Sequence, residues 1–382
     1  MAFRLFRRAA RPEAAKASAA APIMALHGVG RAAWSPRDQV SLARNGYQQN
    51  VVGFRAVRMV AEAAAAVPLA VLADGARAVD HPVARLLARP NPGTDGRSFL
   101  ESVYGHLQLS GNAYVEGAAH DGRNWPRELH ALRPDRMRVV PGPDGWPMGY
   151  EYAVGAARHR WSMEGDIKPI LHLRAFHPLD DHYGMSPLEA AAGAVDTHNA
   201  AAAWAKALLD NAARPSGAIV FGAQDGAAMT EEQYQRILRE VEENHAGARN
   251  AGRPMLLEGG LDWRPMGYSP SEMEFLETKN AAAREIALAF GVPPQLLGLP
   301  GDNTYSNYQE ANRAFYRQTV LPLVRKTAAA LSGWLGGVVI EPDLDAMPAL
   351  AAERDALWKR AGEADFLDED EKRALLGLDP RG

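Results

Sequence analysis

Residues 186–213 have the sequence SPLEAAAGAVDTHNAAAAWAKALLDNAA, which carries a strong signal for the start of a helix. Ser186 and Glu189 have the spacing of a capping box, and Pro187 occupies the first helical position, where a missing N–H costs nothing. The helical pattern extends to Ala213, so we expect a helix about 40 Å long. Apolar residues recur every seven positions and alanine fills much of the remainder, which predicts close packing beside other helices rather than a small core of its own.

A second long helix is expected over residues 271–290. Ser271 and Glu274 again have capping-box spacing, and Gly291 with Pro293-Pro294 ends the helix. We expect four of its residues to form a buried side. These are Leu276, Ala283, Ile286 and Phe290.

The residues between the two long helices, 216–268, predict a compact insert. A strand over 217–221 is followed by a helix that Thr230 and Gln233 cap. The apolar side of that helix follows the i, i+3, i+4, i+7 pattern and consists of Tyr234, Ile237, Leu238 and Val241. A hairpin is predicted next, with its strands and turn at 255–257, 261–264 and Gly259-Gly260. The order of these elements is typical of a stalk that carries a module at its tip.

Upstream of the first long helix, residues 36–185 predict an α+β domain. Helix signals alternate there with short β-type runs between turn residues. The expected helices are 50–67, 81–88 and 98–110, and the expected strands are 69–72, 113–116, 136–140, 150–154 and 170–174. For the third of these helices, Ser98 with Glu101 has capping-box spacing, and Gly111 is the expected C-terminal cap.

Downstream of residue 293 the pattern is mostly helical. Ser306 is the expected cap of a third long helix that reaches Leu335. Pro322 removes a backbone hydrogen bond in its middle, so a kink is expected near residues 318–322. The acidic C-terminal part is expected to be helical, and Asp368-Glu-Asp-Glu371 begins its last helix.

The composition is that of an ordinary globular protein. The 382 residues are 47% hydrophobic and 23% charged, with a formal net charge of −4. The absence of cysteine excludes a disulfide framework, Cys-ligated zinc and thiol catalysis. Residues 1–35 are rich in Arg and Ala and poor in acids, which we interpret as a disordered arm. No window approaches the roughly 18 uninterrupted apolar residues of a membrane span, so none is expected.

Six short segments, taken in their order along residues 45–380, resemble one family. They are Arg89-Pro-Asn-Pro92, Gly111-Asn-Ala-Tyr114, Leu132-Arg-Pro-Asp-Arg136, Tyr183-Gly-Met-Ser-Pro-Leu188, Phe290-Gly-Val-Pro-Pro-Gln-Leu-Leu-Gly298 and Asn303-Thr-Tyr-Ser-Asn307. Each segment alone is a common turn or cap signal. Their joint order is similar to that of the portal proteins of siphovirus-type tailed phages and of gene transfer agents.

This resemblance implies an α+β portal fold in eight parts. They are a flexible N-terminal arm (1–35), an α+β wing (36–185), a stem helix (186–213), a clip (214–269), a second stem helix (270–292), a tunnel loop region (293–306), a kinked wing helix (307–340) and a short helical crown (341–382). The implied function is a ring of twelve subunits at one capsid vertex. Such a ring is the channel for DNA packaging and DNA exit, and the platform to which the head–tail connector attaches.

The resemblance also implies partners and a location. The partners are further copies of the chain, the large terminase ATPase, a head–tail connector or adaptor protein, the major capsid protein and double-stranded DNA that passes without sequence specificity. No membrane and no cofactor are expected. The location is the portal vertex of a virion or virion-like particle that assembles in the bacterial cytoplasm.

Three groups of residues are candidates for these contacts. The tunnel loop candidates are Gly301, Asp302, Asn303, Thr304, Tyr305, Ser306 and Asn307, a stretch without Lys or Arg. Lys206 and Lys279 lie on the expected stem helices, where they either face the channel or are simply solvated. The candidate docking face of the clip helix consists of Glu231, Glu232, Glu240, Glu242 and Glu243. It suits a basic partner, and a solvated face is the alternative.

Two other classes of function remain open from the sequence. One is a metal-dependent hydrolase, because His177, Asp180, Asp181 and His182 lie within six residues. Their spacing matches no standard metal-binding motif, so a solvated loop without catalytic or metal-binding residues is the preferred interpretation. The chain also has no phosphate-binding G-x-x-x-x-G-K-[ST] motif, so we do not expect it to be the packaging ATPase. The other class is a monomeric scaffold with a helical stalk.

Overall fold

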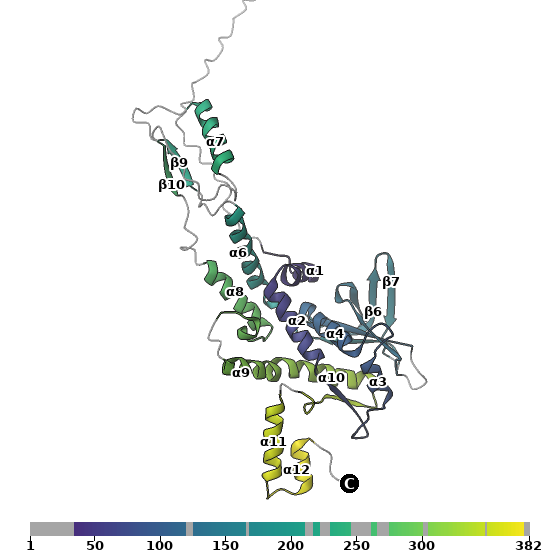
Figure 1. Cartoon of the computed structure of the whole chain (residues 1–382). Coiled ribbons are helices and arrows are strands. Elements are labelled where there is room, and N and C mark those ends of the chain that lie inside the picture. Colours follow the sequence, from purple (N-terminus) through teal and green to yellow (C-terminus); the bar gives the residue numbers. More distant parts are fainter. Residues whose placement is uncertain are drawn as a thin grey trace, which may run out of the picture. The chain divides into compact units, whose positions relative to one another are not determined.

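The computed structural model describes residues 34–119, 125–165, 168–210, 217–221, 230–245, 261–265, 275–300, 305–347 and 350–377. The chain divides into two compact units. The larger unit comprises residues 34–205 and 273–382, and the smaller comprises residues 1–33 and 206–272. Many of their elements are labelled in Figure 1.

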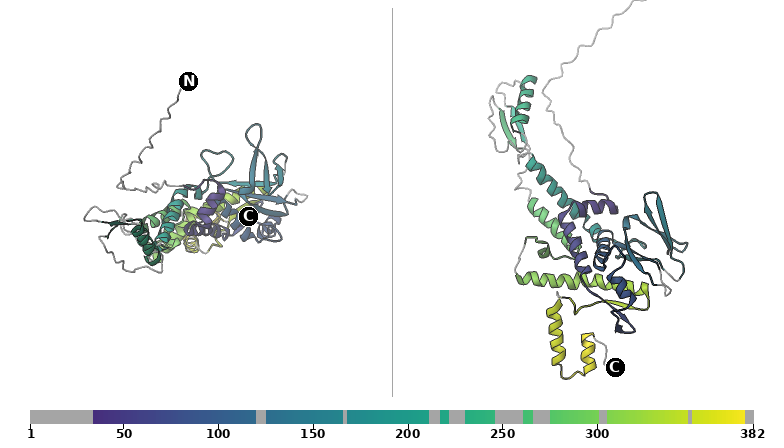
Figure 2. Two further views of the ribbon diagram at one scale, coloured as in Figure 1. Left: turned by 90° about the horizontal axis from the view of Figure 1, so that it is seen from above. Right: turned by 45° about the vertical axis from the view of Figure 1, so that its right-hand side comes forward.

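Helices make up most of the larger unit. They are α1 (Gln39–Ala43), α2 (Val51–Ala65), α3 (Pro82–Ala88), α4 (Gly96–Ser110), α5 (Pro187–Ala190), α6 (Ala192–Asp210, whose last residues belong to the smaller unit), α8 (Phe275–Ala289), α9 (Tyr305–Phe315), α10 (Leu321–Leu335), α11 (Ala351–Glu363) and α12 (Glu369–Leu376). Figure 2 shows α11 and α12 side by side. Two π-helical turns, η1 (Arg44–Gln48) and η5 (Tyr316–Val320), and two 3₁₀ turns, η2 (Pro134–Arg136) and η4 (Pro294–Leu297), complete the helical elements described.

The strands of the larger unit form antiparallel sheets of three strands each. Their orders are β11-β1-β2, β4-β3-β8 and β5-β6-β7. The bounds are β1 (Leu69–Ala73), β2 (Ala76–Arg77), β3 (Asn112–Ala118), β4 (Glu128–Leu132), β5 (Met137–Pro141), β6 (Pro147–Val154), β7 (Ala157–Ser162), β8 (Ile170–Arg174) and β11 (Val339–Pro342). The mixture of helices with antiparallel sheets is the expected α+β class. The sequence did not predict β2, β4, β7 or β11, and β11 joins the C-terminal region to β1 through pairs such as Val71 with Ile340.

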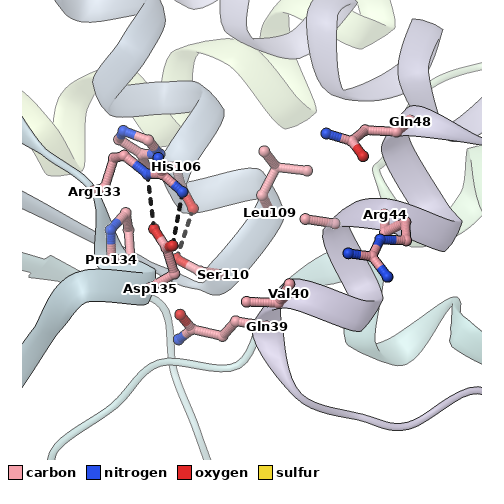
Figure 3. Close-up of a pocket in the computed structure, with 11 residues that line it drawn as sticks. Gln39, Val40, Arg44, Gln48, His106, Leu109, Ser110, Arg133, Pro134 and Asp135 are labelled. Atoms are coloured by element: carbon pink, nitrogen blue, oxygen red, sulfur yellow. Dashed lines mark hydrogen bonds and ion pairs between the residues drawn. The ribbon is translucent and has the colours of Figure 1, made fainter. Parts of the chain in front are cut away.

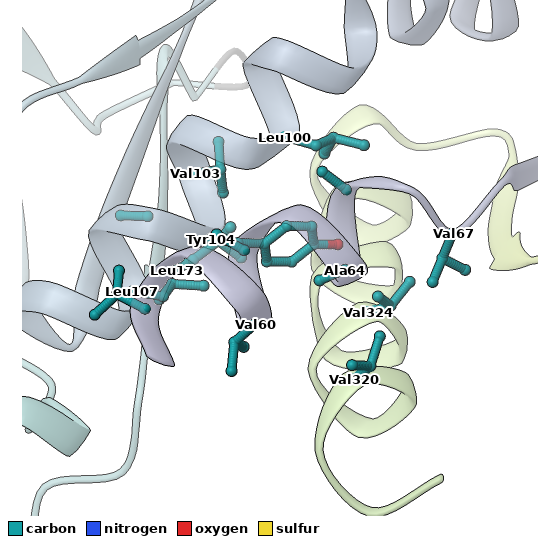
Figure 4. Packing of buried hydrophobic residues seen from close by; sticks show 14 of the residues in the cluster. Val60, Ala64, Val67, Leu100, Val103, Tyr104, Leu107, Leu173, Val320 and Val324 are labelled. Carbon is teal, nitrogen blue, oxygen red and sulfur yellow. The ribbon is translucent and has the colours of Figure 1, made fainter. Parts of the chain in front are cut away.

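The main core lies where α2, α4 and α10 meet. Figure 4 shows the ring of Tyr104 from α4 among Val60 and Ala64 of α2 and Val324 of α10. All four side chains are fully buried. Because α2 presents mainly Ala and Val to this core, the neighbouring backbone can approach closely, and burial of the apolar faces holds the three helices together.

The first long helix differs from the expectation in its continuity. The Ser186 hydroxyl accepts a hydrogen bond from the Glu189 amide at 2.9 Å, so the predicted cap is confirmed. The helix is nevertheless interrupted at Ala191, which separates α5 from α6.

The predicted cap of α4 is wrong, because the carboxylate of Asp95 caps it and Ser98 lies inside the helix. An Asp at the N-cap also places negative charge at the positive end of the helix dipole.

The second long helix, α8, matches the prediction except at its start. Ile286 and Phe290 are buried as expected, but Leu276 is 72% exposed. The reason is that the buried residues of α8 begin at Ala282, so its first two turns lie outside the core. The predicted cap, residues 271–274, lies outside the described residues.

The third long helix has a π-helical turn at the place where a kink was expected. The π-helical turn η5 precedes Pro322, which then stands in the first turn of α10, where no hydrogen bond from its nitrogen is required. In Figure 1 the ribbon of α10 continues that of α9, so a π-turn takes the place of a break. The predicted cap at Ser306 is wrong, because α9 already begins at Tyr305.

The smaller unit contains one strand pair and one helix among its described residues. β9 (Gly217–Phe221) pairs with β10 (Leu261–Pro265) in antiparallel register. Residues 261–264 pair with β9. Their expected partner in the predicted hairpin, residues 255–257, lies outside the described residues. Thr230 and Gln233 exchange hydrogen bonds at the start of α7 (Glu231–His245), so the predicted capping box is confirmed.

Candidate functional site

The structure describes both ends of the predicted tunnel loop but not its middle. Gly301, Asp302, Asn303 and Thr304 lie outside the described residues. Tyr305 begins α9, and Ser306 and Asn307 are exposed in its first turn. The loop candidates are therefore divided between a segment of four residues and the start of a helix.

The N-terminal end of the loop is fixed to α8. The turn η4 ends at Gly298, whose φ of +71° favours glycine. The guanidinium of Arg284 on α8 donates a hydrogen bond to the carbonyl of Pro300. The last described residue before the loop is thus held by a side chain from the preceding helix.

A second contact joins the end of α8 to the π-turn after α9. The Thr319 hydroxyl donates to the carbonyl of Gly291 at 2.6 Å. Gly291 has a φ of +63°, and a Cβ there would lie 2.6 Å from the same hydroxyl, so the contact requires glycine. The neighbouring residues Phe290 and Val292 are buried. The loop therefore starts and ends on a frame of α8, η4, α9 and η5 that has its own hydrogen bonds and core contacts.

The sequence that contains the loop has little positive charge. Residues 298–312 contain no Lys or Arg, and the first basic residue, Arg313, is paired with Glu310 at 3.1 Å. Tyr308 on the same helix is 50% exposed. The side chains of this stretch are thus mainly hydroxyl, amide and aromatic groups, and the guanidinium of Arg284 on α8 lies against the start of the loop at Pro300.

The two candidate stem lysines belong to different units. Lys206 is exposed and lies in the smaller unit. Lys279 is half-buried on α8 in the larger unit. Burial lowers the pKa of His198 on α6, and the positive charge of Lys279 lowers it further. Lys279 thus acts electrostatically on the facing helix, whatever else it contacts.

The sequence did not predict a set of hydrogen bonds that joins α6 to the segment before α2. Asp196 accepts from the backbone amide and the hydroxyl of Ser35, at 3.0 and 2.5 Å. The side chain of Asn50, 1% exposed, donates to Asn199 at 2.9 Å and contacts His198 at 3.2 Å. The sequence did contain a signal for these bonds, namely four consecutive polar residues, 196–199, within an alanine-rich helix. Buried polar groups need hydrogen-bond partners, so such a run indicates contacts with another segment.

A second missed network joins two of the family-like segments. Asn112, 1% exposed, accepts from the Gly184 amide at 2.7 Å and donates to the Gly184 carbonyl at 3.2 Å. His172 lies 3.0 Å from the same Asn112 oxygen. The αL conformation of Gly111 allows the close approach, because a Cβ there would lie 2.4 Å from the Gly184 carbonyl oxygen. This network fixes sheet β4-β3-β8 to the residues that lead into α5.

A third family-like segment, Leu132–Arg136, borders a pocket of about 270 Å³ (Figure 3). Arg133 and Asp135 form a two-point ion pair at 3.0 and 2.7 Å, and Arg44 lies across the pocket from them. Burial lowers the pKa of His106, which also lines the pocket, to about 4. The pocket thus offers a neutral imidazole and an already paired carboxylate, a set that lacks an activated nucleophile.

The loop at residues 177–182 uses its polar groups to hold its own backbone. His177 accepts from the Leu179 amide at 3.0 Å, and Asp180 accepts from the amides of His182 and Tyr183 at 2.8 and 2.9 Å. Across the described part of the chain, no three His, Asp or Glu side chains gather as metal ligands would. The arrangement is that of a turn in which Asp caps the following amides.

The acidic clip residues lie on α7. Glu231, Glu232 and Glu240 are exposed, and Glu242 and Glu243 belong to the same helix, although their side chains lie outside what the structure describes. None of the helices in the described residues is long and apolar enough to cross a membrane.

Comparisons with known proteins agree with this architecture. The phage portal protein family model matches residues 52–377. Two solved structures of a native gene transfer agent particle, one of the virion and one of the neck computed with C12 symmetry, contain a chain that is 59% identical to this one. In both, the TM-score is 0.69, and the match covers 93% of this chain and 97% of the other. A protein of Rickettsia bellii is 39% identical, with 91% of each chain covered. The portal protein of Enterobacteria phage HK97 is 26% identical, with 86% of this chain and 78% of that protein covered. The chain belongs to the phage portal protein family.

Proposed function

We propose that the chain forms the portal ring of a gene transfer agent or phage-like particle. The observation that carries this proposal is the 59% identity, over 93% of the chain, to a chain of a particle neck computed with C12 symmetry. A ring of twelve copies needs heterologous contacts that close on themselves. In this role the chain is a structural component at the capsid vertex rather than an enzyme.

The tunnel loop, residues 301–307, is proposed to line the narrowest part of the channel. Each phosphate contact from Lys or Arg strengthens DNA binding, so a cationic constriction would hold DNA that must move. The loop and the adjoining residues 298–312 lack such cations, and Asp302 adds a negative charge. The contact of Arg284 with Pro300 holds the start of the loop, and the contact of Thr319 with Gly291 ties together the helices on either side of it, which supports a loop carried by a fixed frame.

The remaining partners are assigned to the smaller unit and to the ring as a whole. We propose that the clip around α7 contacts the large terminase ATPase during packaging and the head–tail connector afterwards. The major capsid protein surrounds the ring, and DNA passes through it without sequence specificity. No cofactor takes part.

Deletion of residues 302–305 tests the assignment of the loop. The ring should still assemble, because the frame that carries the loop keeps its contacts, while packaged DNA or its retention should fall several-fold. The control replaces the same four residues with Gly-Ser-Gly-Ser, which keeps the length of the loop and should retain most packaging. A ring structure that places the loop on the outer rim would overturn the assignment.

Native mass measurement separates the ring from a monomeric scaffold. We expect rings at high protein concentration in several salt conditions. Monomers and dimers alone under all of these conditions would contradict the portal function itself, whereas normal rings with normal packaging after the deletion would contradict only the role of the loop.

A further inference from the structure

Three arginines gather on the outer face of the sheet β5-β6-β7. Arg138, Glu151 and Arg160 lie directly opposite one another across the three strands, and Arg158 lies two residues before Arg160 on β7. Successive side chains of a strand point to opposite faces, so these four share one face. The other face carries residues such as Tyr150, which is buried in the second apolar cluster. That packing fixes which face is exposed.

One acid binds two of the three arginines. Arg158 and Arg160 donate to the two carboxylate oxygens of Glu151, at 3.0 and 2.5 Å. The Glu151 side chain is 7% exposed, whereas those of Arg158 and Arg160 are 59% and 74% exposed. The hydrogen bond from Arg160 is the largest cause that lowers the pKa of Glu151, so the carboxylate stays charged. Three guanidinium groups and one carboxylate leave an excess of two positive charges.

Glu151 also orients the two guanidinium groups that it binds. Each guanidinium has five N–H donors in a fixed plane, and one contact with a carboxylate leaves the others available. Arg138 is exposed, and its guanidinium has no hydrogen-bond or ion-pair partner among the described residues. The face therefore presents pre-oriented donors of the geometry that matches phosphate oxygens.

The rest of the face is nearly flat. Gly149, Ala153 and Ser162 share this face with the arginines, and Val140 beside Gly149 is half-buried. A Cβ at Gly149 would lie 2.6 Å from the Trp161 carbonyl oxygen, so this position cannot carry a larger side chain without a shift. A protein partner usually needs a pocket for an aromatic or aliphatic anchor, whereas the side chains described on this face are mainly charged or small. Charged residues on the edge strand β7 also disfavour the addition of a peptide strand.

We propose that this face, defined by Arg138, Glu151, Arg158 and Arg160, binds the phosphate backbone of double-stranded DNA without sequence specificity. Flat, cationic surfaces without base-reading side chains contact DNA through phosphates alone. The site lies on the sheet rather than on the tunnel loop, so it does not rest on the role proposed for that loop. It gives the protein a second contact with the molecule that its ring conducts.

The test is the salt dependence of binding to a random-sequence DNA duplex, measured with the full chain by fluorescence anisotropy. For B-DNA the slope of log K against log salt changes by about 0.9 for each phosphate contact. The variant Arg158→Ala/Arg160→Ala should therefore reduce the slope by about 1.8, while Arg158→Lys/Arg160→Lys should keep most of it. The matched control is Arg85→Ala/Arg89→Ala, which removes two exposed arginines at α3 and should leave the slope unchanged.

Removal of both partners leaves Glu151 buried without a counter-charge and can unfold the sheet. Arg138→Ala avoids this difficulty, because both ion pairs of Glu151 remain, and it should reduce the slope by about 0.9. A wild-type slope for Arg138→Ala and for the folded double variant would overturn the proposal, as would an equal loss in the α3 control. If a polyglutamate peptide binds this face as tightly as the duplex at the same salt concentration, an acidic protein replaces DNA as the ligand and the proposal is also wrong.

Discussion

The larger and smaller units bury their apolar side chains to very different extents. In the larger unit Tyr104 and Ile286 are fully buried, and its buried Asn50 and Asn112 have hydrogen-bond partners. On α7 of the smaller unit, Tyr234 is 52% and Leu238 is 41% exposed, although both belong to the predicted apolar side. A two-stranded sheet such as β9-β10 is only marginally stable alone.

This difference indicates that the two units obtain their stability in different ways. The larger unit has the extensive core of a domain that folds within one subunit, and its buried Asn50 and Asn112 side chains are hydrogen-bonded. Among the described residues of the smaller unit, Tyr234 and Leu238 of α7 are apolar side chains that the subunit leaves exposed, as expected for a part that neighbouring subunits cover. The following predictions test this contrast.

The largest effect on stability is expected at Ile286 in the larger unit. Ile286→Ala should lower the free energy of unfolding by about 2–5 kcal/mol, because it leaves a cavity in a closely packed core. The matched control is Leu276→Ala on the same helix, where the side chain is 72% exposed and the change should stay within about 0.5 kcal/mol. Urea unfolding followed by circular dichroism measures both. Equal losses would show that α8 does not pack as described.

A smaller effect is expected from acid. Burial lowers the pKa of His172 to about 3 and that of His106 to about 4, so both are neutral in the folded larger unit. Unfolded histidine has a pKa of about 6.5, and the unfolded chain therefore binds more protons below that pH. The stability that these two neutral histidines contribute is fully present above pH 6.5. It is lost as the pH falls toward their pKa values in the folded state. At pH 5 the loss should be about 2 kcal/mol for each histidine.

The variant His172→Gln isolates one of these contributions. Glutamine retains a donor toward the Asn112 oxygen but does not titrate, so the fall in stability between pH 7 and pH 5 should shrink by about 2 kcal/mol. Urea midpoints at both pH values supply the measurement. If variant and wild type lose the same stability, His172 is not buried as a neutral group.

The features that were predicted correctly depend on neighbouring residues. Ser186 caps α5, and Thr230 with Gln233 forms the capping box of α7, because a side chain there reaches an amide three residues away. The features that were missed depend on distant residues. Asp196 binds Ser35 across 161 positions and Asn112 binds Gly184 across 72, and no local pattern contains such pairs.

The tunnel loop illustrates the same division. The end of α8 could be predicted from Gly291, Pro293 and Pro294. The contact of Arg284 with Pro300 could not, because an arginine on a helix is usually solvated. The role of residues 301–307 came from the family resemblance, since a short polar loop has no chemical signature of its own.

The smallest effect on stability is expected at the acidic residues of α7. The variant Glu231→Lys/Glu232→Lys/Glu240→Lys reverses three exposed charges and should change the free energy of unfolding by no more than about 1 kcal/mol, mainly because Glu231 and Glu232 lie in the first turn, where acids favour the helix dipole. Terminase binding and particle yield should fall at least tenfold, because complementary charge steers association and reversal opposes it.

The control reverses three exposed acids of the larger unit, Glu277, Glu285 and Glu341, which gives the same change in net charge. Co-sedimentation with terminase and particle counts supply the readout. Unchanged binding by intact rings of the α7 variant would remove the docking proposal, and equal losses in both variants would assign the effect to net charge rather than to the clip.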